Sequence, residues 1–369
     1  MLWRATMSYP QLAVLPTRTI AGPMTSSLGT SSPLPGPFDI RGRPLRDLRI
    51  SVTDRCNFRC VYCMPRDTFG PDHAFRPRAE ILTFEEITRL AGIFTNLGVT
   101  KVRLTGGEPL VRADLETLVS MLHANPAIAD LTLTTNGSLL ARRARALAEA
   151  GLNRVTISLD ALDDPTFSRM NDANFPVARV IEGIAAAEEA GLGPIKVNMV
   201  VKRGWNEQAI LPMARHFRWS GRTVRFIEYM DVGHSNGWRL NEVVPASEIL
   251  ATISAEFPLE PMAPSERGEV AMRYRYGDGS GEIGVIASVT QPFCGDCVRA
   301  RISADGKLFT CLFAVAGHDL RSLVRGGATD EAIEARLRRI WNLRDDRYSE
   351  IRSAETAELP KVEMSYIGG

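Results

Sequence analysis

Six cysteines are the residues whose type and spacing most directly indicate chemistry in this chain of 369 residues. Cysteine thiolates bind zinc and iron–sulfur clusters, and they carry out redox exchange. Six are too few for a disulfide framework in a chain of this length. Because they fall into two groups of three, we expect two metal or redox sites, formed by Cys56, Cys60 and Cys63 and by Cys294, Cys297 and Cys311.

The first triplet has the spacing C-x3-C-x2-C and directly follows an expected strand. A structural zinc site needs a fourth protein ligand, and no histidine occurs between Cys63 and His73. A cubane iron–sulfur cluster held by three thiolates instead keeps one iron open for a substrate or cofactor. The spacing alone leaves zinc and a redox dithiol as alternatives.

The second triplet has the spacing C-x2-C-x13-C and also supplies three thiolates. His318 follows Cys311 closely in the sequence, so a structural Cys3His zinc site is the alternative to a second iron–sulfur cluster.

A glycine-rich turn, Gly106-Gly107-Glu108-Pro109, comes at the end of the second expected strand. Its two glycines allow the backbone to approach a ligand closely. An ordinary strand-to-helix turn is the alternative reading of this motif alone.

Together, the first triplet and this turn resemble the radical S-adenosylmethionine superfamily, whose cysteine motif carries an aromatic residue before its last cysteine, here Tyr62. From Asp47 to Gly369 the chain is similar to the GTP 3′,8-cyclase family of molybdenum cofactor biosynthesis. The matching stretches are DLRISVTDRCNFRCVYCMP, KVRLTGGEPLVR, LTTNG, VTISLD, KVNMVV, RFIEYMDVG, FCGDCVRARISADGKLFTCLF and the final Gly-Gly.

This resemblance implies an enzyme that uses radical chemistry to cyclise GTP to (8S)-3′,8-cyclo-7,8-dihydroguanosine 5′-triphosphate. It implies two [4Fe-4S] clusters, one on each cysteine triplet, with S-adenosylmethionine on the first and the purine of GTP on the second. A peptide-modifying radical enzyme and a non-catalytic metal-binding protein are the alternatives. A flavodoxin or ferredoxin as electron donor, a homodimer and hand-over to the cyclic pyranopterin monophosphate synthase are also implied.

The resemblance further assigns roles to individual residues. Contacts to S-adenosylmethionine are implied for Tyr62, Gly107, Ser158 and Met230. Contacts to GTP are implied for Arg49, Arg103, Thr134, Lys196, Arg299, Ala300 and Arg301. The terminal Gly368 and Gly369 are implied to reach the active site. A triphosphate is strongly anionic, and a chain of net charge +1 must gather cations locally to hold it.

Regular alternation of short β-branched runs with helical segments predicts the scaffold that positions these residues. Strands are expected at 48–53, 99–105, 130–135, 154–159, 196–201 and 222–230, and helices at 84–97, 115–123, 139–150, 177–190, 207–217 and 247–256. About six strand–helix units indicate a parallel α/β sheet, either doubly wound or an incomplete β/α barrel. With the resemblance, the barrel is our expectation for 39–230, followed by a smaller, irregular iron–sulfur domain at 231–369.

Composition excludes several classes of protein. The chain is neither disordered nor fibrous, and its near-zero net charge offers no overall field for nucleic acid or an anionic membrane. No apolar run is long enough to span a bilayer, which favours a cytoplasmic location. Residues 1–38 lack acids and are rich in Ser, Thr and Pro, so we expect a disordered leader, with an organellar transit peptide as the alternative.

Overall fold

A single curved sheet organises the chain, and the computed structural model describes residues 36–353 and 359–368 of it. Most of the predicted leader therefore lies outside the described residues. The strands are β1 (Asp47–Ser51), β2 (Lys101–Thr105), β3 (Asp130–Thr135), β4 (Arg154–Ser158), β5 (Lys196–Val201), β6 (Thr223–Glu228), β7 (Leu259–Met262), β8 (Met272–Tyr276), β9 (Glu282–Ile286), β10 (Arg299–Ile302), β11 (Lys307–Phe309) and β12 (His318–Asp319).

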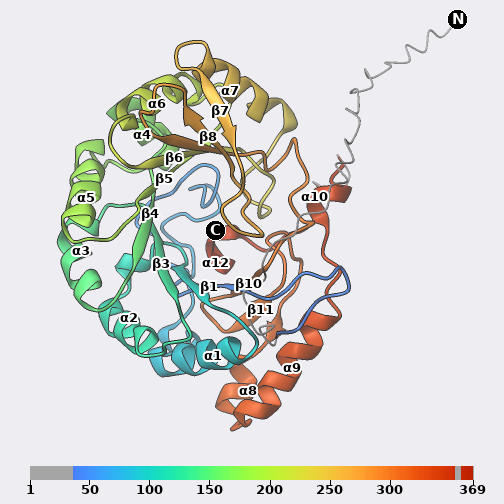
Figure 1. The fold of residues 1–369 in the computed structure, drawn as a ribbon. Coiled ribbons are helices and arrows are strands. Elements are labelled where there is room, and N and C mark those ends of the chain that lie inside the picture. The colour runs from blue at the N-terminus through green and yellow to red at the C-terminus, as the bar shows by residue number, and fades with distance from the viewer. Residues whose placement is uncertain (1–35, 354–358, 369) are drawn as a thin grey trace, which may run out of the picture. The chain divides into compact units, whose positions relative to one another are not determined.

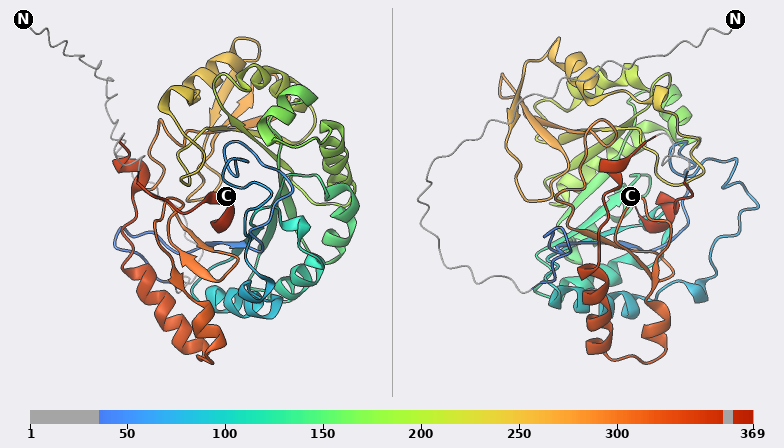
Figure 2. Two further views of the ribbon diagram at one scale, coloured as in Figure 1. Left: turned by 180° about the vertical axis from the view of Figure 1, so that it is seen from behind. Right: turned by 90° about the vertical axis from the view of Figure 1, so that its right-hand side faces the viewer.

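Helices surround this curved sheet, most of them on its outer side (Figures 1 and 2). They are α1 (Phe84–Asn96), α2 (Leu115–His123), α3 (Leu140–Glu149), α4 (Asp164–Asn171), α5 (Val177–Glu189), α6 (Ile210–Phe217), α7 (Ala246–Ser254), α8 (Arg321–Arg325), α9 (Asp330–Asn342) and α10 (Tyr348–Ile351), while α12 (Met364–Ile367) lies inside the ring. None of the helices in the described ranges is long and apolar enough to cross a membrane.

The order of the strands confirms an incomplete barrel. Strands β1 to β6 are neighbours in chain order, whereas a doubly wound sheet reverses direction at an internal switch point. The whole sheet has the order β12-β11-β10-β1-β2-β3-β4-β5-β6-β9-β8-β7, so β12 and β7 are its two edges within the described residues. The sheet is therefore open rather than closed.

The part of the chain that follows residue 230 adds strands to both ends of the sheet. Strand β9 pairs in parallel with β6, and β10 pairs in parallel with β1, which gives eight parallel strands where the sequence predicted about six. The expectation of an irregular segment was wrong here, because β7 to β12 and α9 are regular elements. A domain boundary at 230/231 stays a prediction.

Local sequence accounts for the predicted elements. In α1, the Thr83 hydroxyl accepts from the Glu86 amide at 3.2 Å, and the Glu86 carboxylate accepts from the Thr83 amide at 2.8 Å. This capping box satisfies the free amides at the start of the helix. Ile87, Leu90 and Phe94 form its buried face, as the sequence predicted. The expected helix at 207–217 begins with a 3-10 turn at Glu207–Ala209.

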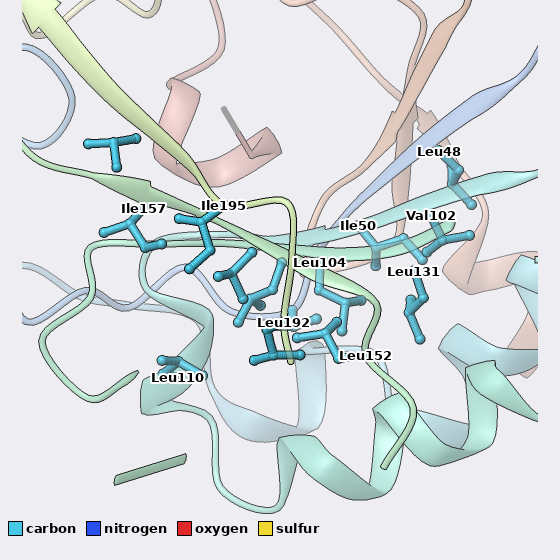
Figure 3. Packing of buried hydrophobic residues seen from close by; sticks show 14 of the residues in the cluster. Leu48, Ile50, Val102, Leu104, Leu110, Leu131, Leu152, Ile157, Leu192 and Ile195 are labelled. Carbon is cyan, nitrogen blue, oxygen red and sulfur yellow. The ribbon is translucent and has the colours of Figure 1, made fainter. Parts of the chain in front are cut away.

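Side chains along each strand point alternately toward the helices and into the barrel, so the hydrophobic core and the barrel interior lie on opposite faces of the sheet. Leu48 and Ile50 of β1, and Val102 and Leu104 of β2, pack between the sheet and the helices (Figure 3). Because successive strand residues point to opposite faces, Arg49 and Arg103 face the other way, into the barrel. The functional side chains therefore occupy every second strand position.

Candidate active site

The first triplet lies in the loop that follows β1. The carbonyl of Cys60 accepts from the amides of Cys63 at 3.0 Å and Met64 at 2.9 Å, which folds the loop into a tight turn. Burial raises the pKa of the Cys60 thiol, and Cys56, Asp160 and Cys63 raise it further. Burial likewise raises the pKa of Cys56 to about 12. The three thiols are therefore close enough to influence one another, and they must lose protons to bind metal.

The second triplet lines one cavity, which it shares with Arg299 and Arg301 of β10. The loop before β10 contributes two of its cysteines, Cys294 and Cys297, and the segment after β11 contributes Cys311. Burial opposes ionisation of Cys297, yet Arg299 and Arg344 lower the pKa of this thiol to about 6. The nearby guanidinium groups thus prepare a thiolate, the form of cysteine that binds metal.

The donor set of each triplet fits a cubane iron–sulfur cluster. Each site offers three buried or half-buried free thiols. Among residues 36–353 and 359–368, no three His, Cys, Asp or Glu side chains gather as they would around a single metal ion. A cubane does not require such a gathering, since its three thiolates bind different irons. His318, the fourth ligand of the alternative zinc site, is exposed on β12 and does not line the cavity of the second triplet.

A buried ion-pair network holds the backbone of the second triplet. Asp39 accepts from Arg43 Nε at 2.6 Å and from Arg344 Nη1 at 3.2 Å, and all three side chains are buried. Arg43 Nη1 donates to the Cys294 carbonyl at 2.7 Å, while Arg344 Nη1 donates to the Cys297 carbonyl at 2.8 Å. Asp39 thereby fixes two guanidinium groups that orient the cysteine loop.

Replacing Asp39 with alanine is expected to destabilise the protein strongly, because it leaves two buried cations without their shared anion. We expect the free energy of unfolding to fall by about 3–5 kcal/mol, measured by urea denaturation of the apoprotein. The control is Asp345→Ala, which removes the half-exposed partner of Arg41 and is expected to cost about 0–1 kcal/mol. Equal losses in the two variants would contradict the role of Asp39.

The glycine-rich turn after β2 packs against the loop of the first triplet. A Cβ atom on Gly106 would lie 2.4 Å from the Thr53 carbonyl oxygen, and one on Gly107 would lie 2.2 Å from that of Arg55. The close approach that the sequence predicted is therefore made to the neighbouring backbone. Glu108 accepts from the amide of Asn136 at 2.7 Å and joins this turn to the loop after β3.

Tyr62 is positioned by a carboxylate that sequence reasoning did not single out. Its hydroxyl donates to Asp160 Oδ2 at 2.9 Å, and the other oxygen of Asp160 accepts from the Val200 amide at 2.9 Å. Burial raises the pKa of Asp160 to about 7. The loop of the first triplet is thus tied to β4 and β5 through one side chain.

One cavity of about 210 Å³ brings most of the predicted residues together. It lies inside the barrel, and it shares four lining residues with the neighbouring cavity of the second triplet, although no cysteine of the described residues lines it. Its lining includes the predicted residues Arg49, Tyr62, Arg103, Thr134, Ser158, Met230, Arg299 and Arg301. Near the first triplet the wall is formed by Tyr62, and near the second by Phe293 and Leu312, which neighbour Cys294 and Cys311.

Three arginines stand side by side across neighbouring strands of this cavity. The strand register aligns Arg301 of β10 with Arg49 of β1, and Arg49 with Arg103 of β2. The Nε atoms of Arg49 and Arg103 are buried without a hydrogen-bond acceptor in the described part of the chain. Burial lowers the pKa of Arg49, and the neighbouring Arg301 lowers it further. Unpartnered donors among like charges indicate a site for an anion.

Three other residues that were predicted to contact S-adenosylmethionine or GTP do not line this cavity. Lys196 is half-buried on β5, two residues before Asn198, which does line it, so both lie on the same strand face. Ala300 is fully buried in the hydrophobic core, and only its backbone can contact a substrate. Gly107 lies in the turn after β2 and is half-buried.

The cavity also contains polar residues that sequence reasoning missed. Arg225 of β6 donates to Asn198 Oδ1 at 2.9 Å, and both line the cavity together with Thr156. Burial lowers the pKa of Arg225 to about 9, with Arg103 adding to the effect. Arg225 interrupts the apolar centre of β6 at an inward position, and this was the signal that could have identified it.

The C-terminal segment enters the interior of the barrel. Lys361 pairs with the buried Asp231 at 3.0 Å, and Glu363 accepts from the Ser235 amide at 3.0 Å. At the end of α12, the carbonyl of Gly368 accepts from Arg301 of the cavity wall. The tail thus reaches the predicted site, and Gly369 lies outside the described residues.

Two family models match the chain. The model described as the radical SAM superfamily covers residues 50–217, and the model described as Molybdenum Cofactor Synthesis C covers residues 222–350. The first includes the Cys56 triplet, and the second includes the Cys294 triplet.

Curated relatives match nearly the full length. A GTP 3′,8-cyclase of Acidothermus cellulolyticus is 57% identical, one of Xanthomonas axonopodis pv. citri is 50% identical, and one of Staphylococcus epidermidis is 48% identical. Each match covers 90% of this chain and 98% of the relative.

Proposed function

This chain belongs to the GTP 3′,8-cyclase family of radical S-adenosylmethionine enzymes, and from that membership we propose how its residues bind the cofactors and the substrate. The enzyme cyclises GTP to (8S)-3′,8-cyclo-7,8-dihydroguanosine 5′-triphosphate, the first step of molybdenum cofactor biosynthesis. The observation that carries the proposal is the arginine-lined cavity, which includes Tyr62 of the first triplet's loop and shares Arg299 and Arg301 with the cavity of the second triplet.

Cys56, Cys60 and Cys63 would hold the first [4Fe-4S] cluster. When bound, this cluster and S-adenosylmethionine supply the electron and the hydrogen-abstracting chemistry that side chains lack. Tyr62, held by Asp160, forms the nearby wall of the cavity. Ser158 and Met230 line the same cavity, and with the backbone of Gly107 they are our proposed contacts for S-adenosylmethionine.

Cys294, Cys297 and Cys311 would hold a second [4Fe-4S] cluster, whose open iron would bind the purine of GTP. The low pKa of Cys297, caused by Arg299 and Arg344, supports metal binding here. A purine on this cluster would extend into the cavity beside Arg299 and Arg301. The ribose would then lie between the two cofactors, as the reaction requires.

The triphosphate would bind the arginine row of Arg49, Arg103 and Arg301. Guanidinium groups suit phosphate because their parallel N–H groups donate in pairs. The unpartnered Nε atoms of Arg49 and Arg103 offer such donors. Thr134 of β3 and Arg225 of β6 extend the polar wall. Lys196 would act from outside the lining, on the same face of β5 as Asn198, and Ala300 would contribute only backbone contacts.

Enclosure of the cavity would protect the reaction from water and from other hydrogen donors. Met364 of α12 forms part of the lining, and the adjoining Gly368 contacts Arg301. We therefore assign the tail, including Gly369, a role in completing the site around bound GTP.

The remaining partners are also part of this proposal. Reductive cleavage of S-adenosylmethionine consumes an electron, so a one-electron donor such as a flavodoxin or ferredoxin must supply it. A homodimer and transfer of the cyclised nucleotide to the cyclic pyranopterin monophosphate synthase rest on the family resemblance alone.

The test is anaerobic reconstitution with iron and sulfide, followed by incubation with GTP, S-adenosylmethionine and dithionite. We expect about eight iron and eight sulfide per chain, together with 5′-deoxyadenosine and a cyclised nucleotide. Zinc without sulfide would support a non-catalytic metal protein instead. Cleavage of S-adenosylmethionine that never yields a cyclised nucleotide would support the peptide-modifying alternative.

Lys196 is expected to make GTP binding depend on pH. Burial lowers the pKa of Lys196 to about 8, and Arg225 adds to the effect. The ammonium that attracts phosphate is therefore lost as the pH rises through about 8. We expect the KM for GTP to increase by up to about tenfold per pH unit above that point.

The matched variant for this prediction is Lys196→Arg, which keeps a positive charge that does not titrate in this range. Its KM for GTP is expected to rise far less than that of the parent as the pH passes through about 8, because Arg225, with a pKa of about 9, still holds most of its charge there. An equally steep rise in both proteins would assign the pH dependence to another group.

A further inference from the structure

Ser349 of α10 contacts a thiol of the second triplet although it lies far along the chain. Its hydroxyl oxygen is 2.8 Å from Cys294 Sγ, and its backbone nitrogen is 3.3 Å from the same sulfur. Both residues are buried. One sulfur therefore faces two potential donors from a single buried residue.

The surroundings of the Ser349 hydroxyl fix the direction of its proton. The oxygen accepts from the amides of Phe293 at 3.0 Å and Cys294 at 3.1 Å. A serine hydroxyl has two lone pairs and one proton. Because both lone pairs are occupied by amide donors, the proton points toward Cys294 Sγ. The hydroxyl is thus a committed donor to the sulfur.

We propose that Ser349 is a positioning residue that raises the reduction potential of the second cluster through its two hydrogen bonds to Cys294. This inference rests on the proposed role of Cys294 as a cluster ligand. Hydrogen bonds to a ligand sulfur withdraw electron density and stabilise the more negative, reduced form of a cluster. The same withdrawal makes the open iron a better acceptor for a purine.

Ser349 can be tested apart from the substrate contacts. It does not line the cavity that holds the arginine row, whereas Arg299, which influences Cys297, does. A change at Ser349 therefore alters the cluster environment without removing a group proposed to touch GTP. Its effect should appear first in the potential of the cluster.

The experiment is a redox titration of the full-length, reconstituted holoenzyme, followed by electron paramagnetic resonance. In Ser349→Ala we expect the midpoint potential of the second cluster to shift to a more negative value, with that of the first cluster unchanged. Ser349→Thr keeps the hydroxyl and is expected to restore the parent value. An unchanged midpoint potential in Ser349→Ala, with both clusters present, would overturn the inference.

A further variant keeps the inference testable if Ser349→Ala fails to bind the second cluster. Ser349→Cys retains a weaker donor and is expected to give a smaller negative shift. If its midpoint potential equals that of the parent, the inference is wrong. Iron and sulfide analysis of the parent protein tests the proposed function separately. If the parent binds only one cluster, the second cluster itself is refuted, whatever the role of Ser349.

Discussion

Cys60→Ala is expected to abolish both the cleavage of S-adenosylmethionine and the cyclisation of GTP, whereas Cys294→Ala is expected to abolish only the cyclisation. The first variant removes a thiolate from the half-buried turn beside Tyr62, where the reducing cluster would bind. The second removes a thiolate from the cavity proposed to bind the purine. Each loss should reach roughly 10³-fold or more, because no other group supplies the same chemistry.

The two variants act as controls for each other, since each should keep the opposite cluster. We expect each to retain roughly half of the iron and sulfide of the parent protein after reconstitution. Chromatography of 5′-deoxyadenosine and of the cyclised nucleotide then measures the two steps separately. Full GTP turnover in Cys294→Ala would remove the second triplet from the mechanism.

The strands and helices that have a clear local sequence pattern were predicted correctly. The bounds of β3, β5 and α2 match the expected ranges, because β-branched runs and an amphipathic period identify them without tertiary information. In contrast, β10 is four residues long and carries Arg299 and Arg301, so its pattern resembles a polar loop. Its place in the sheet depends on pairing with β1, which is far away in sequence.

The site residues likewise fall into those that the sequence could identify and those that it could not. Both triplets and the glycine-rich turn could be found from spacing, and family resemblance supplied eight of the nineteen residues that line the cavity. The positioning groups could not be found, because their partners are remote: Asp160 holds Tyr62 from 98 residues away, and Arg344 reaches Asp39 across 305 residues. Such contacts exist only once the sheet and the C-terminal segment are assembled.

The Gly368→Ala variant is expected to displace the tail and to lower GTP turnover by about 10²-fold. A Cβ atom at this position would lie 2.2 Å from Thr105 Cγ2 of β2, and the backbone has a φ of +77°, which side chains disfavour. The tail must therefore shift away from Arg301, whose guanidinium donates to the Gly368 carbonyl. Steady-state measurement of the cyclised nucleotide checks this result.

Two matched changes separate the steric clash from backbone strain. Gly327→Ala imposes the same φ of +77° with nothing within 4 Å of the new Cβ, and it is expected to leave turnover nearly unchanged. Thr105→Ser removes the clashing methyl group but keeps the hydroxyl, so Gly368→Ala combined with Thr105→Ser should regain part of the lost turnover. If the single variant Gly368→Ala turns over GTP like the parent, the tail does not need its close contact with β2, and its proposed role in completing the site is wrong.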